Sequence, residues 1–140
     1  MTLLYTDPLF LKHDTGKHPE SADRLRSISK QLEKAGLIQK CRAGPSQPLT
    51  EPAVSKVHAA KQIQAAKQVA EHGGGMLDAD TIVCPDSFKV GLAASGACVA
   101  AVDAVIKGTE KNALCLVRPP GQGFGLLVAK FGDFRMISAT

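Results

Sequence analysis

Two histidines and two arginines are the residues of this 140-residue chain whose types and spacing could do chemistry. His13 and His18 lie in one polar loop that also carries Glu20, and imidazole with carboxylate is a common set of metal ligands. A spacing of five in a loop is unspecific, so metal binding by this loop alone is the less favoured interpretation. Arg24 and Arg118 could collect an anionic substrate or product, or they could form ordinary ion pairs with Asp or Glu. The sequence leaves both alternatives open.

The stretch before Arg118 indicates where such chemistry belongs. Five apolar residues, 113–117, predict a strand buried on both faces, and Pro119-Pro120 ends it. Ligands of α/β proteins bind outside the carboxyl ends of parallel strands, so we expect the active edge at residues 118–125. The glycines of 121–125 lack the sixth-position glycine of a dinucleotide fingerprint, because Leu126 stands there. They are better interpreted as a loop that needs small residues.

Apolar spacing predicts the elements that must position this edge. The expected order is a strand at 3–6, a helix at 21–36, a second strand at 37–42, one or two helices between 50 and 72, a helix at 87–107 and the strand at 113–117. Gly73-Gly74-Gly75 is interpreted as a flexible turn. The helix at 87–107 consists largely of Ala, Gly and Ser, which predicts close packing against a sheet and against neighbours on its other side. Strands separated by helices imply parallel pairing, so the predicted class is α/β.

Composition narrows the classes of partner. The apolar content of 44% fits one globular domain, and no apolar run approaches the roughly 20 residues of a membrane span. Four scattered cysteines without a CxxC pair suggest reduced thiols and a cytoplasmic location. The net charge is +4 and the pI about 9.0, but the basic stretch 24–42 includes Glu33 and has no aromatic residue for stacking. We therefore expect no nucleic acid and no membrane as partner.

Several short motifs occur in a fixed order along the chain. They are Leu4-Tyr-Thr-Asp7, His13-Asp-Thr-Gly, His18-Pro-Glu20 with Arg24-Leu25, Val57-His58, Asp80-Thr81, Ser87 with the alanine-rich helix, and Val117-Arg-Pro-Pro-Gly121. From Leu3 to Gly121 this set resembles the amino-terminal part of the histone deacetylase and acetylpolyamine amidohydrolase family, close to its class II-like bacterial members. The resemblance implies the front part of an arginase/deacetylase fold, with a partial parallel sheet flanked by helices. It also implies a zinc-activated water that hydrolyses the N-acetyl amide of acetylated lysine or an acetylated polyamine.

The resemblance also assigns site residues. Arg24 resembles the arginine that lines an internal channel below the metal, and Asp80 resembles the rim aspartate that hydrogen-bonds the substrate backbone. Gly121 resembles the glycine before the paired catalytic histidines, but Gln122 and Gly123 stand where that pair is expected. The family's zinc ligands match no residue here, so the resemblance implies no catalytic residue, no metal ligand and no cofactor in this chain.

These departures predict two parts, a deacetylase-like portion at 1–121 and a divergent tail at 122–140. A frameshifted or truncated reading frame is our hypothesis for the junction at Gln122. Two functional classes stay open: a deacetylase-family protein that ends before the metal ligands and is inactive alone, or a non-catalytic interaction or regulatory module derived from that fold. An apolar strand with an unpaired edge also predicts self-association.

Overall fold

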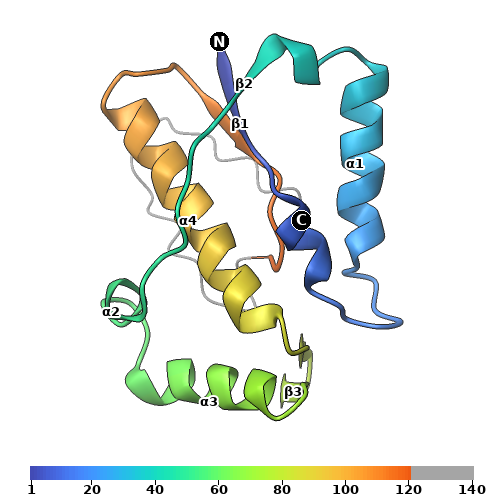
Figure 1. Cartoon of the computed structure of the whole chain (residues 1–140), viewed down its shortest axis with the longest axis vertical. Helices are drawn as coiled ribbons and strands as arrows, with labels where there is room; N and C mark the ends of the chain where they lie inside the picture. The colour runs from blue at the N-terminus through green and yellow to red at the C-terminus, as the bar shows by residue number, and fades with distance from the viewer. Residues whose placement is uncertain (121–140) are drawn as a thin grey trace.

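A three-stranded parallel sheet between two helices forms the centre of the molecule. The computed structural model describes residues 1–120, so the predicted tail at 122–140 lies outside the described residues. The strands β1 (Thr2–Tyr5), β2 (Cys41–Ala43) and β5 (Ala113–Cys115) pair in the order β2-β1-β5. Helices α1 (Ala22–Lys34) and α4 (Ser87–Ile106) lie on opposite sides of these strands (Figure 1). The predicted α/β class and the parallel pairing are confirmed.

Shorter elements surround this centre. Two 3₁₀ turns, η1 (Pro8–Lys12) and η2 (Ile38–Lys40), precede α1 and β2 respectively. Helices α2 (Glu51–Val54) and α3 (Ala60–Glu71) follow β2, and the strands β3 (Gly75–Asp78) and β4 (Thr81–Val83) form an antiparallel hairpin. The predicted strand at 37–42 begins only at Cys41, because η2 occupies its first residues. The interpretation of Gly73–Gly75 as a turn alone was incomplete, since Gly75 already belongs to β3.

Glycines end the two long helices as the sequence predicts. Gly36 follows α1 with φ of +64°, and Gly108 follows α4 with φ of +70°, a conformation that costs little without a Cβ. The Leu37 N–H donates to the Leu32 carbonyl at 2.9 Å after α1, and an equivalent 2.9 Å bond closes α4. These bonds satisfy helix carbonyls that would otherwise lack a partner.

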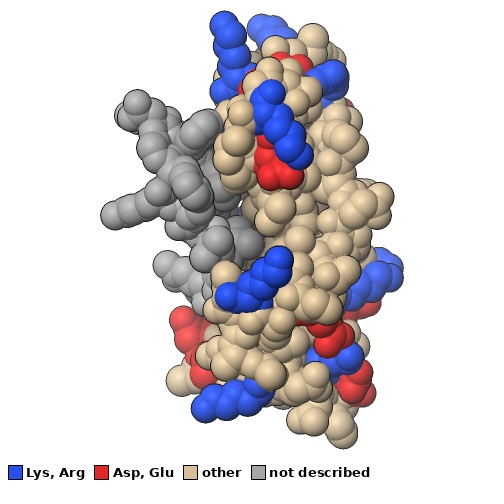
Figure 2. All heavy atoms as spheres, turned by 90° about the vertical axis from the view of Figure 1, so that its left-hand side faces the viewer, with Lys and Arg blue, Asp and Glu red and all other residues tan. Residues whose placement is uncertain are grey.

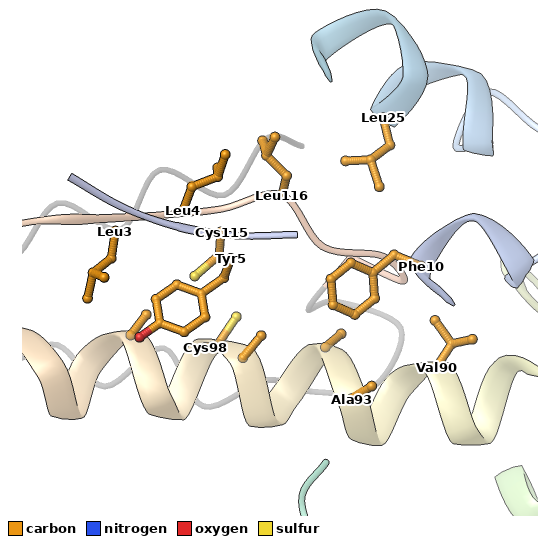
Figure 3. Close-up of a cluster of buried hydrophobic side chains, with 13 residues drawn as sticks. Leu3, Leu4, Tyr5, Phe10, Leu25, Val90, Ala93, Cys98, Cys115 and Leu116 are labelled. Atoms are coloured by element: carbon orange, nitrogen blue, oxygen red, sulfur yellow. The ribbon is translucent and has the colours of Figure 1, made fainter. Parts of the chain in front are cut away.

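The core alternates between the two faces of the sheet. Leu3, Tyr5 and Cys115 point toward α4, whereas Leu4 and Leu116 point toward Leu25 of α1 (Figure 3). All six side chains are buried, as the two-residue period of a strand requires when both faces are covered. Cys98 of α4 and Cys115 of β5 place their sulfurs toward one another between the sheet and the helix (Figure 3).

Small side chains let α4 pack closely on two sides. Ala94, Ala97 and Ala101 are buried in the sheet-facing core. On another side, the segment 44–49 crosses the helix at Gly96, and the Leu49 N–H donates to the Leu92 carbonyl at 3.0 Å. The predicted close packing is confirmed. By length and hydropathy α4 could cross a membrane, but a core helix passes the same test.

On the face drawn in Figure 2, charged side chains of the described residues are spread out rather than gathered in one patch. Figure 2 shows Lys and Arg at both ends of one face, with Asp or Glu beside most of them. Glu110 pairs with the amino terminus and with Arg42, and Lys107 pairs with Asp103. In each pair at least one partner is more than half exposed, so these pairs contribute little to stability. Self-association stays a prediction: within residues 1–120, β5 pairs with β1 alone.

Candidate functional site

The chain topology marks one edge of the sheet as the place for a site. From β1 the chain passes through α1 to β2 on one side, and from β2 it returns through α4 on the other side to β5. The two connections run on opposite sides of the sheet, and the carboxyl ends of the adjacent parallel strands β1 and β5 lie side by side between them. Such a switch point is where open α/β sheets bind ligands. The loop 6–21 and residues 118–120 meet there.

Arg118 and Glu20 form a buried ion pair at this point. The Arg118 side chain is buried, its Nε donates to Glu20 Oε1 at 2.7 Å, and its Nη2 donates to Oε2 at 2.9 Å. Its Nη1 also donates to the His13 carbonyl at 2.8 Å. Two parallel bonds from guanidinium to carboxylate fix both groups in one orientation. Of the two alternatives for Arg118, the structure shows the ion pair.

His13 extends this network to the start of α4. Its Nδ1 lies 2.7 Å from Ser87 Oγ, and its Nε2 lies 3.8 Å from Glu20 Oε2. The Cys84 N–H donates to the same Ser87 hydroxyl at 2.8 Å. His13 and Ser87 are buried, with exposed fractions of 3% and 0%. The network therefore joins three segments that are far apart in sequence: the loop after β1, the start of α4 and the end of β5.

The same contacts set the protonation of the pair. Burial lowers the pKa of His13 below its ordinary 6.5, and the nearby Arg118 charge lowers it further, so His13 is neutral at pH 7. Burial raises the pKa of the Glu20 carboxyl, but the hydrogen bond and charge of Arg118 outweigh this effect. The net result is a pKa below 4.5 and an ionised Glu20.

These shifts predict how stability depends on pH. Both pKa values are depressed in the folded chain, so the unfolded chain binds protons first as the pH falls. We expect a constant free energy of unfolding from pH 8 to about 7, a decline through His13 below about 6.5, and a further decline through Glu20 below about 4.5. Urea unfolding at half-unit pH steps measures this profile. His13→Asn should remove the first decline and keep the second. A wild-type chain that gains stability between pH 7 and 5.5 would contradict the assignment.

Asp80 and His18 meet at the rim of this edge. Asp80 lies at the tip of the β3–β4 hairpin with its side chain 93% exposed, and its Oδ1 is 3.4 Å from His18 Nε2. The Glu20 N–H donates to His18 Nδ1 at 3.1 Å, which leaves Nε2 to carry the proton of the neutral ring. The imidazole therefore presents its N–H to the Asp80 carboxylate.

Of the other residues to which the resemblance assigns a role, the structure describes Arg24 but not Gly121. Arg24 is half-buried in the first turn of α1, and its charge helps to lower the pKa of Glu20. Both arginines thus act on one carboxylate. Gly121, Gln122 and Gly123 lie outside the described residues. The roles that the resemblance gives to Arg24, Asp80 and Gly121 stay predictions.

The sequence did not predict that these residues form one network. The polar loop, Ser87 and Arg118 each stand out in the sequence, but nothing in their spacing pairs Glu20 with a residue 98 positions away. The motif His18-Pro-Glu20 was the available signal.

The donor groups do not fit a zinc site at the end of β5. Within residues 1–120, no three His, Cys, Asp or Glu side chains lie close enough to hold one metal ion. His13 and His18 bond to different partners, although they share a loop. Residues 121–140 contain no His or Cys and a single acidic side chain, Asp133. A catalytic zinc needs about three protein ligands, and residues 1–120 do not supply them by themselves.

Fold and site together define a doubly wound α/β domain with a buried charge network at its switch point. The family model for the histone deacetylase domain matches residues 18–122, three quarters of the chain, so the chain belongs to the histone deacetylase family. The predicted family is confirmed.

Similar proteins agree with this assignment. The histone deacetylase-like amidohydrolase of Pseudomonas aeruginosa is 32% identical over 104 residues, which cover 74% of this chain and 27% of that protein. The polyamine deacetylase HDAC10 of Homo sapiens is 32% identical over 108 residues, covering 73% of this chain and 16% of that protein. The crystal structure of the HDA15 HD domain matches with a TM-score of 0.80 at 26% identity, over 86% of this chain and 36% of that one. The chain thus spans about a third or less of these relatives.

Proposed function

We propose that this chain is the scaffold portion of a deacetylase-type N-acetyl amide hydrolase and does not hydrolyse amides by itself. The observation that carries the proposal is the buried Arg118–Glu20–His13 network. It fixes the backbone just before Gln122 and Gly123, which occupy the place of the family's catalytic histidine pair. Neither residue titrates near neutrality, so neither can take or give the proton that amide hydrolysis requires.

The proposed substrate side is the rim at Asp80. Its exposed carboxylate, held beside His18, could accept a backbone N–H of a peptide or an amine N–H of a polyamine. One relative is named a polyamine deacetylase and another a histone deacetylase-like amidohydrolase, so both acetylated polyamines and acetylated lysine are candidates. We place the protein in the cytoplasm, where reducing conditions suit the four free cysteines.

An assay of the purified chain tests the proposal. With a fluorogenic acetyl-lysine peptide or N-acetylated spermidine and added zinc, we expect release of acetate at the rate of the buffer blank. Gln122→Ala should behave identically, because Gln122 contributes no proton transfer. Turnover that zinc stimulates, that a chelator abolishes and that the variant loses would show that the chain is an active hydrolase.

A further inference from the structure

A cavity on the far side of α4 from the sheet belongs to neither the network nor the rim contact. It has a volume of about 530 Å³ and lies between α3, α4 and the β3–β4 hairpin. Phe88, Gly91, Leu92 and Ser95 of α4 line it, one stripe of the helix, whereas Val90, Ala94 and Ala97 form the stripe on the sheet. Pockets for small molecules span about 300–1,000 Å³, so the size suits a ligand.

Several of the residues that line this cavity are small. Gly91 and Ser95 of α4 and Ala65 and Ala66 of α3 all belong to the lining, and none of the four has a side chain large enough to fill the space. Larger apolar side chains close the cavity around them, namely Val54, Ile63, Leu77, Phe88 and Leu92. The walls are therefore mainly aliphatic, and a ligand that enters must bury an apolar body.

Among residues 1–120, one lysine at the rim of the cavity, Lys61, forms no ion pair. Asp78 also lines the cavity and keeps its negative charge, but its two oxygens accept from the Asp80 N–H and the Thr81 hydroxyl, both at 2.9 Å, so the carboxylate is bonded to the hairpin turn. Lys67 of α3 already has partners: its Nζ lies 2.7 Å from Glu51 Oε1 and 6.0 Å from the centre of the Phe88 ring. Lys61 also lines the cavity, is exposed, and forms no ion pair with any residue in 1–120.

We propose that this cavity binds a medium-chain aliphatic monocarboxylate. The chain would lie among Ile63, Leu77 and Phe88, and the carboxylate would face the Lys61 ammonium at the mouth. An aliphatic cation would be repelled by the same ammonium, and Asp78, whose two oxygens are bonded within the hairpin turn, would have to give up those bonds to accept from it. The mouth therefore favours an anion. The inference does not depend on deacetylase chemistry. None of the residues named in the hydrolase proposal lines the cavity, although the hairpin that carries Asp80 also contributes Leu77 and Asp78 to its lining.

Calorimetric titration of the full chain with hexanoate, octanoate and decanoate tests the proposal. Burying a methylene contributes about 0.8 kcal/mol, or about fourfold in Kd, so each two-carbon step should tighten binding about fifteenfold while the cavity has room. The stoichiometry should be one per chain. Octylamine should bind more weakly than octanoate. No saturable heat from any acid, or equal binding of octylamine and octanoate, would overturn the proposal.

Two variants and one control variant locate the binding. Lys61→Gln should weaken octanoate about threefold, the contribution of an exposed charge pair, and Lys56→Gln, an exposed lysine that does not line the cavity, should not change it. Ala65→Phe should fill the cavity and abolish binding, with its melting temperature measured to show that the chain is folded. If Ala65→Phe is unfolded, the comparison of Lys61→Gln with Lys56→Gln tests the location of the ligand instead. Octanoate binding that neither Lys61→Gln nor a folded Ala65→Phe alters would place the ligand elsewhere.

Discussion

Replacing Glu20 with Gln is expected to lower the free energy of unfolding by about 3 kcal/mol, the lower end of the range for breaking a buried ion pair. The variant keeps the shape of the side chain and removes the charge that faces Arg118, which is 3% exposed. A guanidinium left buried without an anion is costly, because little water can reach it in place of the lost carboxylate. The lower end applies because the Glu20 side chain is 16% exposed, so some solvent reaches the site. For a domain stabilised by about 5–15 kcal/mol, this is a large fraction.

A double-mutant cycle separates the pair from its surroundings. Arg118→Met removes the buried cation, so Glu20→Gln in that background should cost much less than it does in the native chain. Asp23→Asn is the matched control: Asp23 Oδ1 and Arg26 Nη1 are also 2.7 Å apart, but both side chains are more than half exposed. We expect no measurable change from the control in urea unfolding. Equal effects of Glu20→Gln and Asp23→Asn would mean that burial does not strengthen the Arg118–Glu20 pair.

Gly96→Ala is expected to destabilise the chain by about 2 kcal/mol, although alanine favours a helix over glycine by about 1 kcal/mol. A Cβ on residue 96 would overlap the Gln47 carbonyl oxygen and would lie 3.1 Å from the Leu49 nitrogen. These are backbone atoms, so the segment 44–49 must move away from α4, which also breaks the bond from Leu49 to Leu92. Overpacking of this kind outweighs the gain in helix propensity.

Unfolding in urea measures this effect as a shift of the midpoint by about 1 M for a slope of about 2 kcal/mol/M. Limited proteolysis should cut the segment 44–49 faster in Gly96→Ala than in the native chain. Ser95→Ala, one residue earlier on the same helix, raises helix propensity without approaching that segment, and it should be neutral or slightly stabilising. A Gly96→Ala chain as stable as Ser95→Ala would show that the close approach tolerates a methyl group.

Local features of the sequence determined much of this fold. The apolar runs at residues 3–5 and 113–115 formed strands, the three- and four-residue spacing of Leu25, Ile28 and Leu32 formed α1, and Gly36 and Gly108 ended helices. Each of these features is a pattern of neighbouring residues, so it can be recognised from the sequence without knowing the fold. The ordered motifs ending in Val117-Arg-Pro-Pro-Gly121 also sufficed to name the family.

Only the tertiary structure decided the partners of the polar groups and the empty space between elements. Arg118 could have faced an open edge or an acid, and folding placed Glu20 against it across 98 residues. The β3–β4 hairpin was not predicted, because its short strands carry a weak pattern. The cavity is lined by small residues of both α3 and α4 together with the bulkier Phe88 and Ile63, and only the packing of the two helices brings these residues around one space. Pairing and packing depend on distances between residues remote in sequence, and those distances are fixed only when the whole core closes.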